Sequence, residues 1–338
     1  MSKIRIIDVA TLANVSKSTV SQYLNGRFGH MSAQTKERIR DAVEALNYIP
    51  NPIARSLKSD KTKTIGVIVR DISGFNTSRI LRGIDDFCKK NEYNVLIYNT
   101  DFDEEVERRS LLTLRQMRVD GIIITSTGKN VKLINEYAET GFPIVQFQLE
   151  YNDCHTDIVL SDDREASQKA TEYLISLGHQ RIAFITQVFE DNLCRSERYQ
   201  GYVNALQANG ITLDKDLIQY WDRETGFQQS PIQLLETKKA PTAFFTQHLA
   251  ITTELLKKLN IANIEVPEQV SIVGFDEIPM VEMFKVPVTV VQQDSYHLGI
   301  ESAKLLLDGL MSEKQSNEAK IVIVPCSLIK RSSCREIN

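Results

Sequence analysis

Residues 16–25 carry short polar side chains at a spacing that could read DNA. The run is Ser-Lys-Ser-Thr-Val-Ser-Gln-Tyr-Leu-Asn, in which hydroxyl, amine and amide groups alternate with apolar side chains. In a helix, such groups can reach base edges in the major groove, while the apolar ones face a small core. We therefore expect DNA contacts from the polar members, which are Ser16, Lys17, Ser18, Thr19, Ser21, Gln22 and Asn25.

The neighbouring segments are suited to hold that helix in place. Residues 6–13 have apolar residues at helical spacing, Asn14 follows as a tight turn, and Ser16 is a suitable N-cap for the next helix. A third helix should start after Ser32 and close a core with Ile39, Ala42, Val43 and Leu46. The pattern indicates a helix-turn-helix headpiece.

A second candidate DNA contact follows the headpiece. Pro50 and Pro52 should end one helix and start another, which is too short to be stable alone. Leu57, flanked by cations, would be an apolar wedge suited to parting a base step in the minor groove. We therefore add Ala54, Arg55 and Leu57 to the expected DNA-binding residues.

The charge distribution supports a polyanion partner for the N-terminal part alone. The chain has 338 residues and a formal net charge of −4. Residues 1–63 hold 11 Lys and Arg against 5 Asp and Glu, whereas the rest holds 29 against 39. A basic head on an acidic body is the pattern expected when only the head meets nucleic acid.

Beyond a polar linker at 59–63, short apolar strands alternate with amphipathic helices, which predicts parallel α/β sheets. The two sets, before and after about residue 160, suggest two subdomains with a ligand cleft at the carboxyl ends of the strands. Expected strands are 65–69, 94–98, 121–125, 143–147, 181–186, 217–220, 243–245, 270–274 and 320–325. Expected helices are 80–91, 106–117, 131–140, 166–177, 196–209, 230–236, 251–259 and 295–310. Asp162 is expected to open the helix at 166.

Four residues near strand ends have the chemistry of a ligand site. The guanidinium of Arg198 can hold a carboxylate or a hydroxyl pair through two parallel hydrogen bonds. Asp276 can accept hydrogen bonds from sugar hydroxyls. Phe75 and Trp221, the only tryptophan, could stack on a sugar face.

Signals for catalysis, metals and membranes are weak. No Gly-x-Gly-x-x-Gly follows an expected strand, and neither a phosphate-binding loop nor Gly-x-Ser-x-Gly occurs. The five histidines are scattered, and the five cysteines lack zinc-site or redox spacing. We expect no catalytic residue, no metal and no cofactor. Without a secretory signal or an apolar run near 18 residues, we expect a cytoplasmic protein that does not enter a membrane.

The chain resembles the LacI/GalR family of bacterial transcription regulators, because short motifs of that family occur in the same order along it. The headpiece matches are Asp8-Val9-Ala10, Val15-Ser16, Thr19-Val20-Ser21, Leu24-Asn25 and residues 43–48 and 51–57. The body matches are residues 64–69, 119–123, 177–183, 270–276 and 327–331.

The resemblance implies an α/β protein with an N-terminal all-α helix-turn-helix headpiece and a two-subdomain body like periplasmic binding proteins. It implies a headpiece and hinge helix at 1–58 and an effector-binding and dimerisation body at 59–338. Within the body, about 64–160 would join 291–322, and 161–290 would join 323–331. The chain would cross between subdomains near 160, 290 and 322. The resemblance also supports effector contacts by Arg198 and Asp276.

Several positions depart from the family pattern. Gln22 stands where many members have Arg, and Gln reads adenine best, whereas Arg reads guanine. Gln148 and His248 stand where acids or amides are common, so the cleft should be less negative and should favour an acidic ligand. Gln293 completes the expected effector set. The recognition helix also resembles the subgroup that regulates 2-keto-3-deoxygluconate and hexuronate use.

These observations predict a homodimeric repressor of sugar or sugar-acid catabolism that binds operator DNA and is controlled by a small metabolite. A sugar acid such as 2-keto-3-deoxygluconate is the expected effector. Two alternatives share the same body: a solute-binding protein and a sugar-metabolising enzyme. The basic head argues against the first, and the missing phosphate-binding loop argues against the second.

Overall fold

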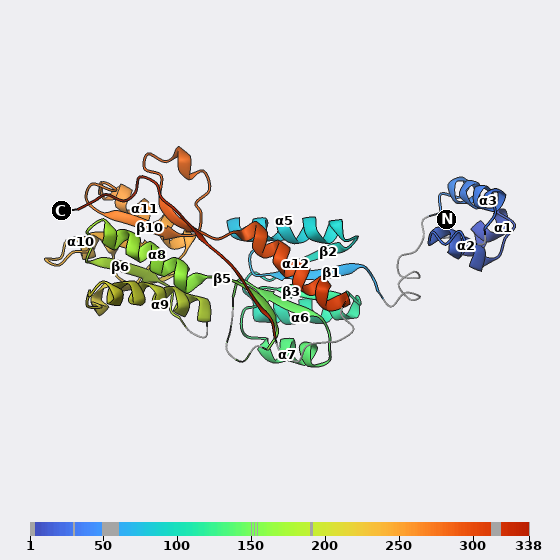
Figure 1. The fold of residues 1–338 in the computed structure, drawn as a ribbon, viewed down its shortest axis with the longest axis horizontal. Coiled ribbons are helices and arrows are strands. Elements are labelled where there is room, and N and C mark those ends of the chain that lie inside the picture. The colour runs from blue at the N-terminus through green and yellow to red at the C-terminus, as the bar shows by residue number, and fades with distance from the viewer. Residues whose placement is uncertain are drawn as a thin grey trace. The chain divides into compact units, whose positions relative to one another are not determined.

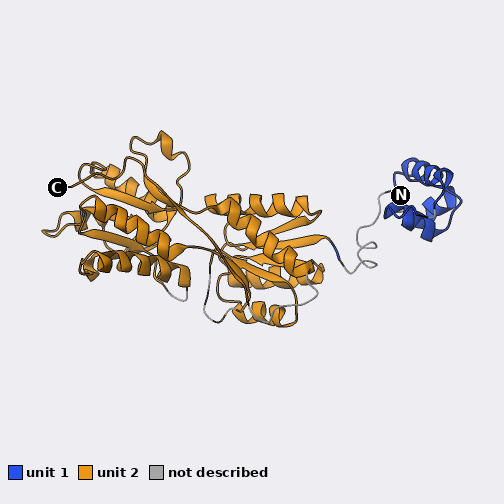
Figure 2. Cartoon of the chain, viewed as in Figure 1, with its two compact units in different colours: residues 1–62 blue, residues 63–338 orange. Residues whose placement is uncertain are grey.

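The computed structural model of the protein describes residues 4–29, 31–48, 61–149, 151, 153, 155–189, 192–311 and 319–337. It divides into two compact units, Met1–Thr62 and Lys63–Asn338 (Figure 2).

The first unit is a bundle of the three expected helices, α1 (Ile6–Leu12), α2 (Lys17–Leu24) and α3 (Ala33–Ala45). The Oγ of Ser16 accepts a hydrogen bond from the Thr19 amide at 3.1 Å, and Ser32 caps α3 in the same way. Both expected N-caps are thereby confirmed. The buried core of this unit consists of Val9, Ala10, Ala13, Val20, Ile39 and Ala42.

The second unit contains two mostly parallel sheets, each with its own helices (Figure 1). The six-stranded sheet has the order β12-β5-β4-β3-β1-β2 and is parallel throughout. Its strands are β1 (Thr64–Val69), β2 (Asn94–Asn99), β3 (Gly121–Ile124), β4 (Ile144–Phe147), β5 (Asp157–Ser161) and β12 (Ile321–Val324). Its helices are α5 (Phe75–Lys90), α6 (Glu104–Gln116), α7 (Val131–Glu139) and α12 (Ser295–Met311). We call this part the six-stranded lobe.

The seven-stranded sheet has the order β13-β11-β10-β9-β6-β7-β8 and defines the seven-stranded lobe. Only its outer pairs, β13 with β11 and β7 with β8, are antiparallel. Its strands are β6 (Ile182–Thr186), β7 (Ile218–Asp222), β8 (Gly226–Phe227), β9 (Ala243–Thr246), β10 (Ser271–Phe275), β11 (Thr289–Gln292) and β13 (Ser327–Ile329). Its helices are α8 (Asp163–Ser176), α9 (Leu193–Ala208), α10 (Pro231–Leu235) and α11 (Leu249–Ile261), with short 3-10 turns η1 (Lys215–Leu217) and η2 (Val281–Met283).

Glycines let the helices of each lobe approach closely. A Cβ on Gly83 of α5 would lie 2.1 Å from the backbone oxygen of Tyr296 in α12, and one on Gly299 would lie 2.1 Å from that of Ile80. Gly201 of α9 makes the same close approach to the backbone oxygen of Arg164 in α8. Neither pair of helices could pack this closely with a larger residue at these points.

The chain passes between the lobes three times. β5 ends at Ser161 in one lobe and α8 begins in the other; β11 ends at Gln292 before α12, and β12 ends at Val324 before β13. These crossings lie close to the positions that the family resemblance implies. The α/β class, the parallel sheets and the helical headpiece are confirmed.

Some expected details differ. Asp162 does occupy the N-cap position of α8, which begins three residues earlier than expected, but its side chain makes no cap hydrogen bond. Its Oδ1 instead accepts a hydrogen bond from the Cys326 amide at 2.6 Å, which joins the first crossing to the third. Four strands were not expected: β5, β11 and β13, which flank the crossings, and the two-residue strand β8.

Over the described residues, no helix is long and apolar enough to cross a membrane, and no cluster of three or more His, Cys, Asp or Glu could hold a metal. The four described cysteines are not joined by disulfides.

Candidate functional site

The helix α2 presents most of the expected base-reading side chains to solvent. Lys17, Ser18 and Gln22 are exposed, whereas Val20 is fully buried in the headpiece core. Ser18 and Gln22 are four residues apart and so lie on one face of the helix. This face offers a hydroxyl and an amide, and the exposed Lys17 beside it adds an ammonium; base edges in a major groove can pair with all three.

The remaining headpiece candidates hold the ends of that helix. Ser16 is exposed and caps α2, and its hydroxyl lies 2.6 Å from that of Ser18 and 2.8 Å from that of Thr19. Asn25 donates from its side-chain amide to the backbone oxygen of Ser21 at 2.7 Å. Ala54, Arg55 and Leu57 lie outside the described residues.

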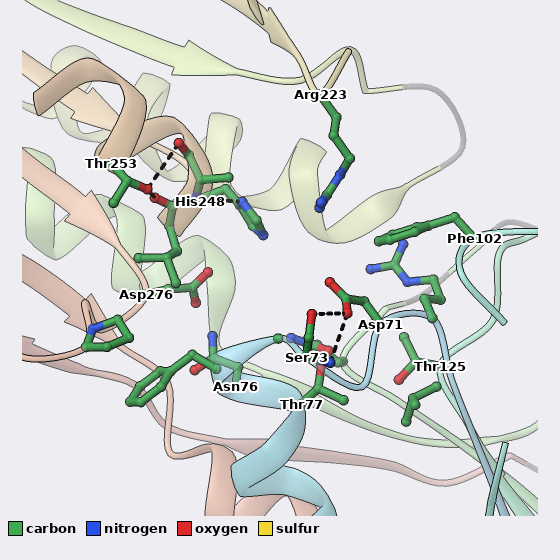
Figure 3. Close-up of a pocket in the computed structure, with 18 residues that line it drawn as sticks. Asp71, Ser73, Asn76, Thr77, Phe102, Thr125, Arg223, His248, Thr253 and Asp276 are labelled. Carbon is green, nitrogen blue, oxygen red and sulfur yellow. Dashed lines mark hydrogen bonds between the residues drawn. The ribbon is translucent and has the colours of Figure 1, made fainter. Parts of the chain in front are cut away.

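A pocket of about 440 Å³ lies between the lobes of the body, at the carboxyl ends of β1, β3 and β10 (Figure 3). This is the sheet edge where open α/β folds bind ligands. Four of the expected effector residues line it: Phe75, Gln148, His248 and Asp276. The other lining residues are Val69, Arg70, Asp71, Ser73, Gly74, Asn76, Thr77, Phe102, Thr125, Arg223, Leu249, Ala250, Thr253 and Pro279.

Three expected effector residues are not among those that line the pocket. Arg198 is buried: its Nε donates to Asp163 at 2.7 Å, a terminal nitrogen donates to the Gln247 carbonyl at 2.8 Å, and its guanidinium lies 3.7 Å from the Phe275 ring centroid. Its donors thus serve the interior of the seven-stranded lobe.

Trp221 and Gln293 are likewise buried. The Trp221 ring belongs to the hydrophobic core under α11, and its Nε1 donates to Glu254 at 2.5 Å. Gln293 accepts a hydrogen bond from Ser161 at 2.8 Å and donates to Asp276 at 2.5 Å. Gln293 therefore reaches the pocket only through Asp276.

Backbone geometry and burial set the character of the pocket. Gln148 and Asp276 have positive φ angles of 68° and 77°, a conformation that non-glycine residues rarely adopt and that often marks functional sites.

Burial lowers the pKa of His248 to about 4, so its imidazole is neutral near pH 7. The neutral ring can both donate and accept hydrogen bonds.

Two lining arginines were not expected from the sequence. Arg70 follows β1 and Arg223 follows β7, each directly after a strand, and that position is the signal that could have identified them. The guanidinium carbons of Arg70 and Arg223 lie 5.2 Å and 4.8 Å from the centroid of the Phe102 ring. The pocket thus combines cations, carboxylates and two aromatic rings, Phe75 and Phe102.

Two family models match the chain. Residues 5–51 match the bacterial regulatory proteins of the lacI family, and residues 171–334 match a periplasmic binding protein-like domain. The "Probable HTH-type transcriptional regulator EndR" of Paenibacillus polymyxa is 34% identical over 316 residues, 92% of each chain.

Solved structures are similar over the same length. A lac repressor dimer bound to operator and the anti-inducer ONPF superposes with a TM-score of 0.86 at 25% identity, covering 99% of this chain and 100% of that one. A complex of the transcriptional regulator CelR with cellobiose has a TM-score of 0.71 at 26% identity, covering 98% and 99%. With the exposed face of α2 and the two-lobed body, these likenesses show that the chain belongs to the LacI family of bacterial transcription regulators, which bind DNA through a helix-turn-helix.

Proposed function

We propose that this regulator is a dimeric repressor whose affinity for its operator changes when a sugar acid fills the pocket between the lobes. The observation that carries the effector assignment is the composition of the pocket. Arg70 and Arg223 offer cations, while Asp276 and the neutral His248 offer hydrogen-bond partners for hydroxyls. A small molecule with a carboxylate and several hydroxyls matches this set.

The size of the pocket and one similar structure support a sugar-sized ligand. A volume of about 440 Å³ lies within the range of small-molecule sites. The CelR structure holds cellobiose, a neutral sugar, in a regulator with the same architecture. The arginines of the present pocket are the reason to propose an acid here, with 2-keto-3-deoxygluconate as the first compound to test.

On the DNA side, we propose that two headpieces read two half-sites. The lac repressor structure to which the chain is similar is a dimer on its operator. Lys17, Ser18 and Gln22 would contact base edges, and Leu57 would enter the minor groove at the centre of the site. Dimers of this kind place two recognition helices one helical turn of DNA apart.

The proposed control is thermodynamic linkage. The effector changes operator affinity only to the extent that it binds the DNA-competent state of the body differently from the other state. The pocket residues belong to both lobes, so a ligand that contacts both changes the relative stability of their arrangements.

A gel-shift titration with the DNA upstream of the gene tests the proposal. The salt concentration is held fixed, because phosphate contacts make the affinity for DNA steeply salt-dependent. The full chain should shift a near-palindromic site, and the Leu57→Ala variant should bind that site more weakly. 2-Keto-3-deoxygluconate, gluconate or glucuronate should alter the shift, and their neutral parent sugars should not. A neutral sugar that acts at lower concentration than every acid would contradict the effector proposal and leave the DNA-binding assignment intact.

A further inference from the structure

Two cations from different lobes meet at one aromatic ring in the pocket. Arg70 follows β1 of the six-stranded lobe, and Arg223 follows β7 of the seven-stranded lobe. Both guanidinium groups lie within 5.2 Å of the Phe102 ring centroid, and all three residues line the same pocket. Figure 3 shows Arg223 extending into the pocket toward the side occupied by Phe102.

The Arg70 side chain is half-buried and has no ion-pair partner among the described residues. Its Nε is buried without a hydrogen bond, and no described carboxylate forms an ion pair with Arg70 or Arg223. Burial lowers the pKa of Arg70; the nearby Tyr151 hydroxyl and Glu107 carboxylate raise it, while Arg195 and Arg223 lower it further. The half-buried Arg70 and the exposed Arg223 thus line one pocket without a carboxylate ion pair among the described residues, and two such guanidinium groups can donate to one anion.

We propose that Arg70, Arg223 and Phe102 form an oxyanion clamp that binds the charged group of the effector and joins the two lobes through it. This clamp rests on the function proposed above, because it assumes that the effector is an anion that also carries hydroxyl groups. The Arg70 and Arg223 guanidinium groups donate to its oxygens, and the Phe102 ring holds both groups in place through cation–π contacts.

The other end of the pocket provides the complementary chemistry. His248, Asp276 and Asn76 line it together, and Figure 3 shows Asp276 and Asn76 apart from Arg223 and Phe102. Asp276 accepts hydrogen bonds and the neutral His248 can donate one, so this end suits hydroxyls. The ligand is thereby oriented, with its oxyanion at Arg70 and Arg223 and its hydroxyls at Asp276.

Asp71 offers a rival explanation for Arg223. Its carboxylate also lines the pocket, but its Oδ1 already accepts hydrogen bonds from the amide of Ser73 at 2.9 Å and from the hydroxyl of Ser73 at 2.5 Å. If Arg223 serves only to pair with Asp71 when the lobes move, replacing Arg223 should weaken all ligands alike. The clamp instead predicts that only charged ligands are affected.

Calorimetric titration of the full chain with matched ligands separates these possibilities. The ligands are gluconate, glucuronate, 2-keto-3-deoxygluconate, glucose 6-phosphate and glucose, and the variants are Arg70→Gln and Arg223→Gln. Each variant should lose roughly 10- to 100-fold in affinity for charged ligands, the range expected for a hydrogen bond to a charged group. Arg79→Gln is the matched control, because Arg79 is exposed and lies over Phe75 at 5.5 Å but does not line the pocket.

Thermal unfolding provides a readout that does not depend on knowing the effector. Inorganic phosphate should raise the melting temperature of the wild type and of Arg79→Gln at matched ionic strength, with little effect on Arg70→Gln or Arg223→Gln. Without any anion, Arg70→Gln should melt no lower than the wild type, because the substitution breaks no ion pair among the described residues. A lower melting temperature would show that Arg70 is a structural residue, and an equal phosphate effect in all four proteins would overturn the clamp.

The outcomes distinguish the clamp from the proposed effector. Binding of glucose 6-phosphate but of no sugar acid, with loss in both variants, would support the clamp and contradict the sugar-acid assignment. Binding of a sugar acid with unchanged affinity in both variants would support that assignment and overturn the clamp.

Discussion

Replacing Arg198 tests whether this residue supports the seven-stranded lobe or binds the effector. Its side chain and that of Asp163 are 9% and 4% exposed and form an ion pair at 2.7 Å. Arg198→Met keeps an unbranched apolar chain over Phe275 but leaves the Asp163 carboxylate without its cation. It also removes the hydrogen bond to the Gln247 carbonyl.

The expected loss is large because one partner of a buried pair is left behind. Breaking such a pair costs about 3–5 kcal/mol of unfolding free energy. For a body of this size, that corresponds to a melting temperature lower by roughly 6–20 °C. Arg181→Met is the control: Arg181 pairs with Asp214 at 2.9 Å, but these side chains are 32% and 33% exposed. Its ion pair should contribute only about 0–1 kcal/mol.

The loss should also depend on pH. Burial raises the pKa of Asp163, and Arg198 opposes that rise. Without Arg198, the folded-state pKa rises further above the unfolded value, so the protonated acid is favoured in the folded variant. The variant should therefore be closest to the wild type in acid and should lose stability relative to it as the pH rises toward the new pKa.

Differential scanning calorimetry between pH 5 and pH 8 measures both effects. The double variant Arg198→Met with Asp163→Leu should recover much of the stability, because it removes the stranded charge. If Arg198→Met unfolds like Arg181→Met but no longer binds the effector, the structural role is refuted, and the ligand contact expected from the family resemblance is favoured instead.

Three further predictions concern the headpiece, the pocket and the helix packing. Gln22→Arg should change the preferred base at one position in each half-site, with about 1–3 kcal/mol against the wrong base; an unchanged consensus in binding-site selection would show that Gln22 reads no base. Because burial lowers the pKa of His248 to about 4, below its usual 6.5, the wild type should lose stability as the pH falls from about 6.5; a His248→Gln variant with the same pH profile in urea unfolding would contradict this. Gly83→Ala should cost about 1–3 kcal/mol by forcing α5 from α12, whereas Gly309→Ala, with open space at its Cβ, should be neutral or stabilising; equal melting temperatures would refute the packing argument.

The helices were the most predictable part of the fold because their signals are local. Ser16 and Ser32 precede apolar residues at helical spacing, and both cap a helix in the structure. The missed strands are harder for the opposite reason. β11 has four residues and β13 has three, and each becomes a strand through partners that are distant in sequence. No periodicity within such short segments can reveal those partners.

The candidate site was predictable in position but not in membership. Strand ends indicated the edge of the sheet, and Phe75, Gln148, His248 and Asp276 do line the pocket there. Whether a side chain enters a pocket or the interior depends on tertiary packing. The Arg198 guanidinium lies on Phe275 and binds Asp163, partners supplied by β10 and α8.

Gln293 indicates how the pocket and the crossings between the lobes can be coupled. It lies in the second crossing, accepts a hydrogen bond from Ser161 at the end of the first, and donates to Asp276 in the pocket. The first crossing is in turn joined to the third through Asp162 and the Cys326 amide. The Gln293 amide donates to Oδ1 of Asp276, so a ligand hydroxyl that donates to this same oxygen would compete with it. A ligand that replaced this hydrogen bond would change a contact of the second crossing, which is a physical route by which an effector could favour one arrangement of the lobes over another.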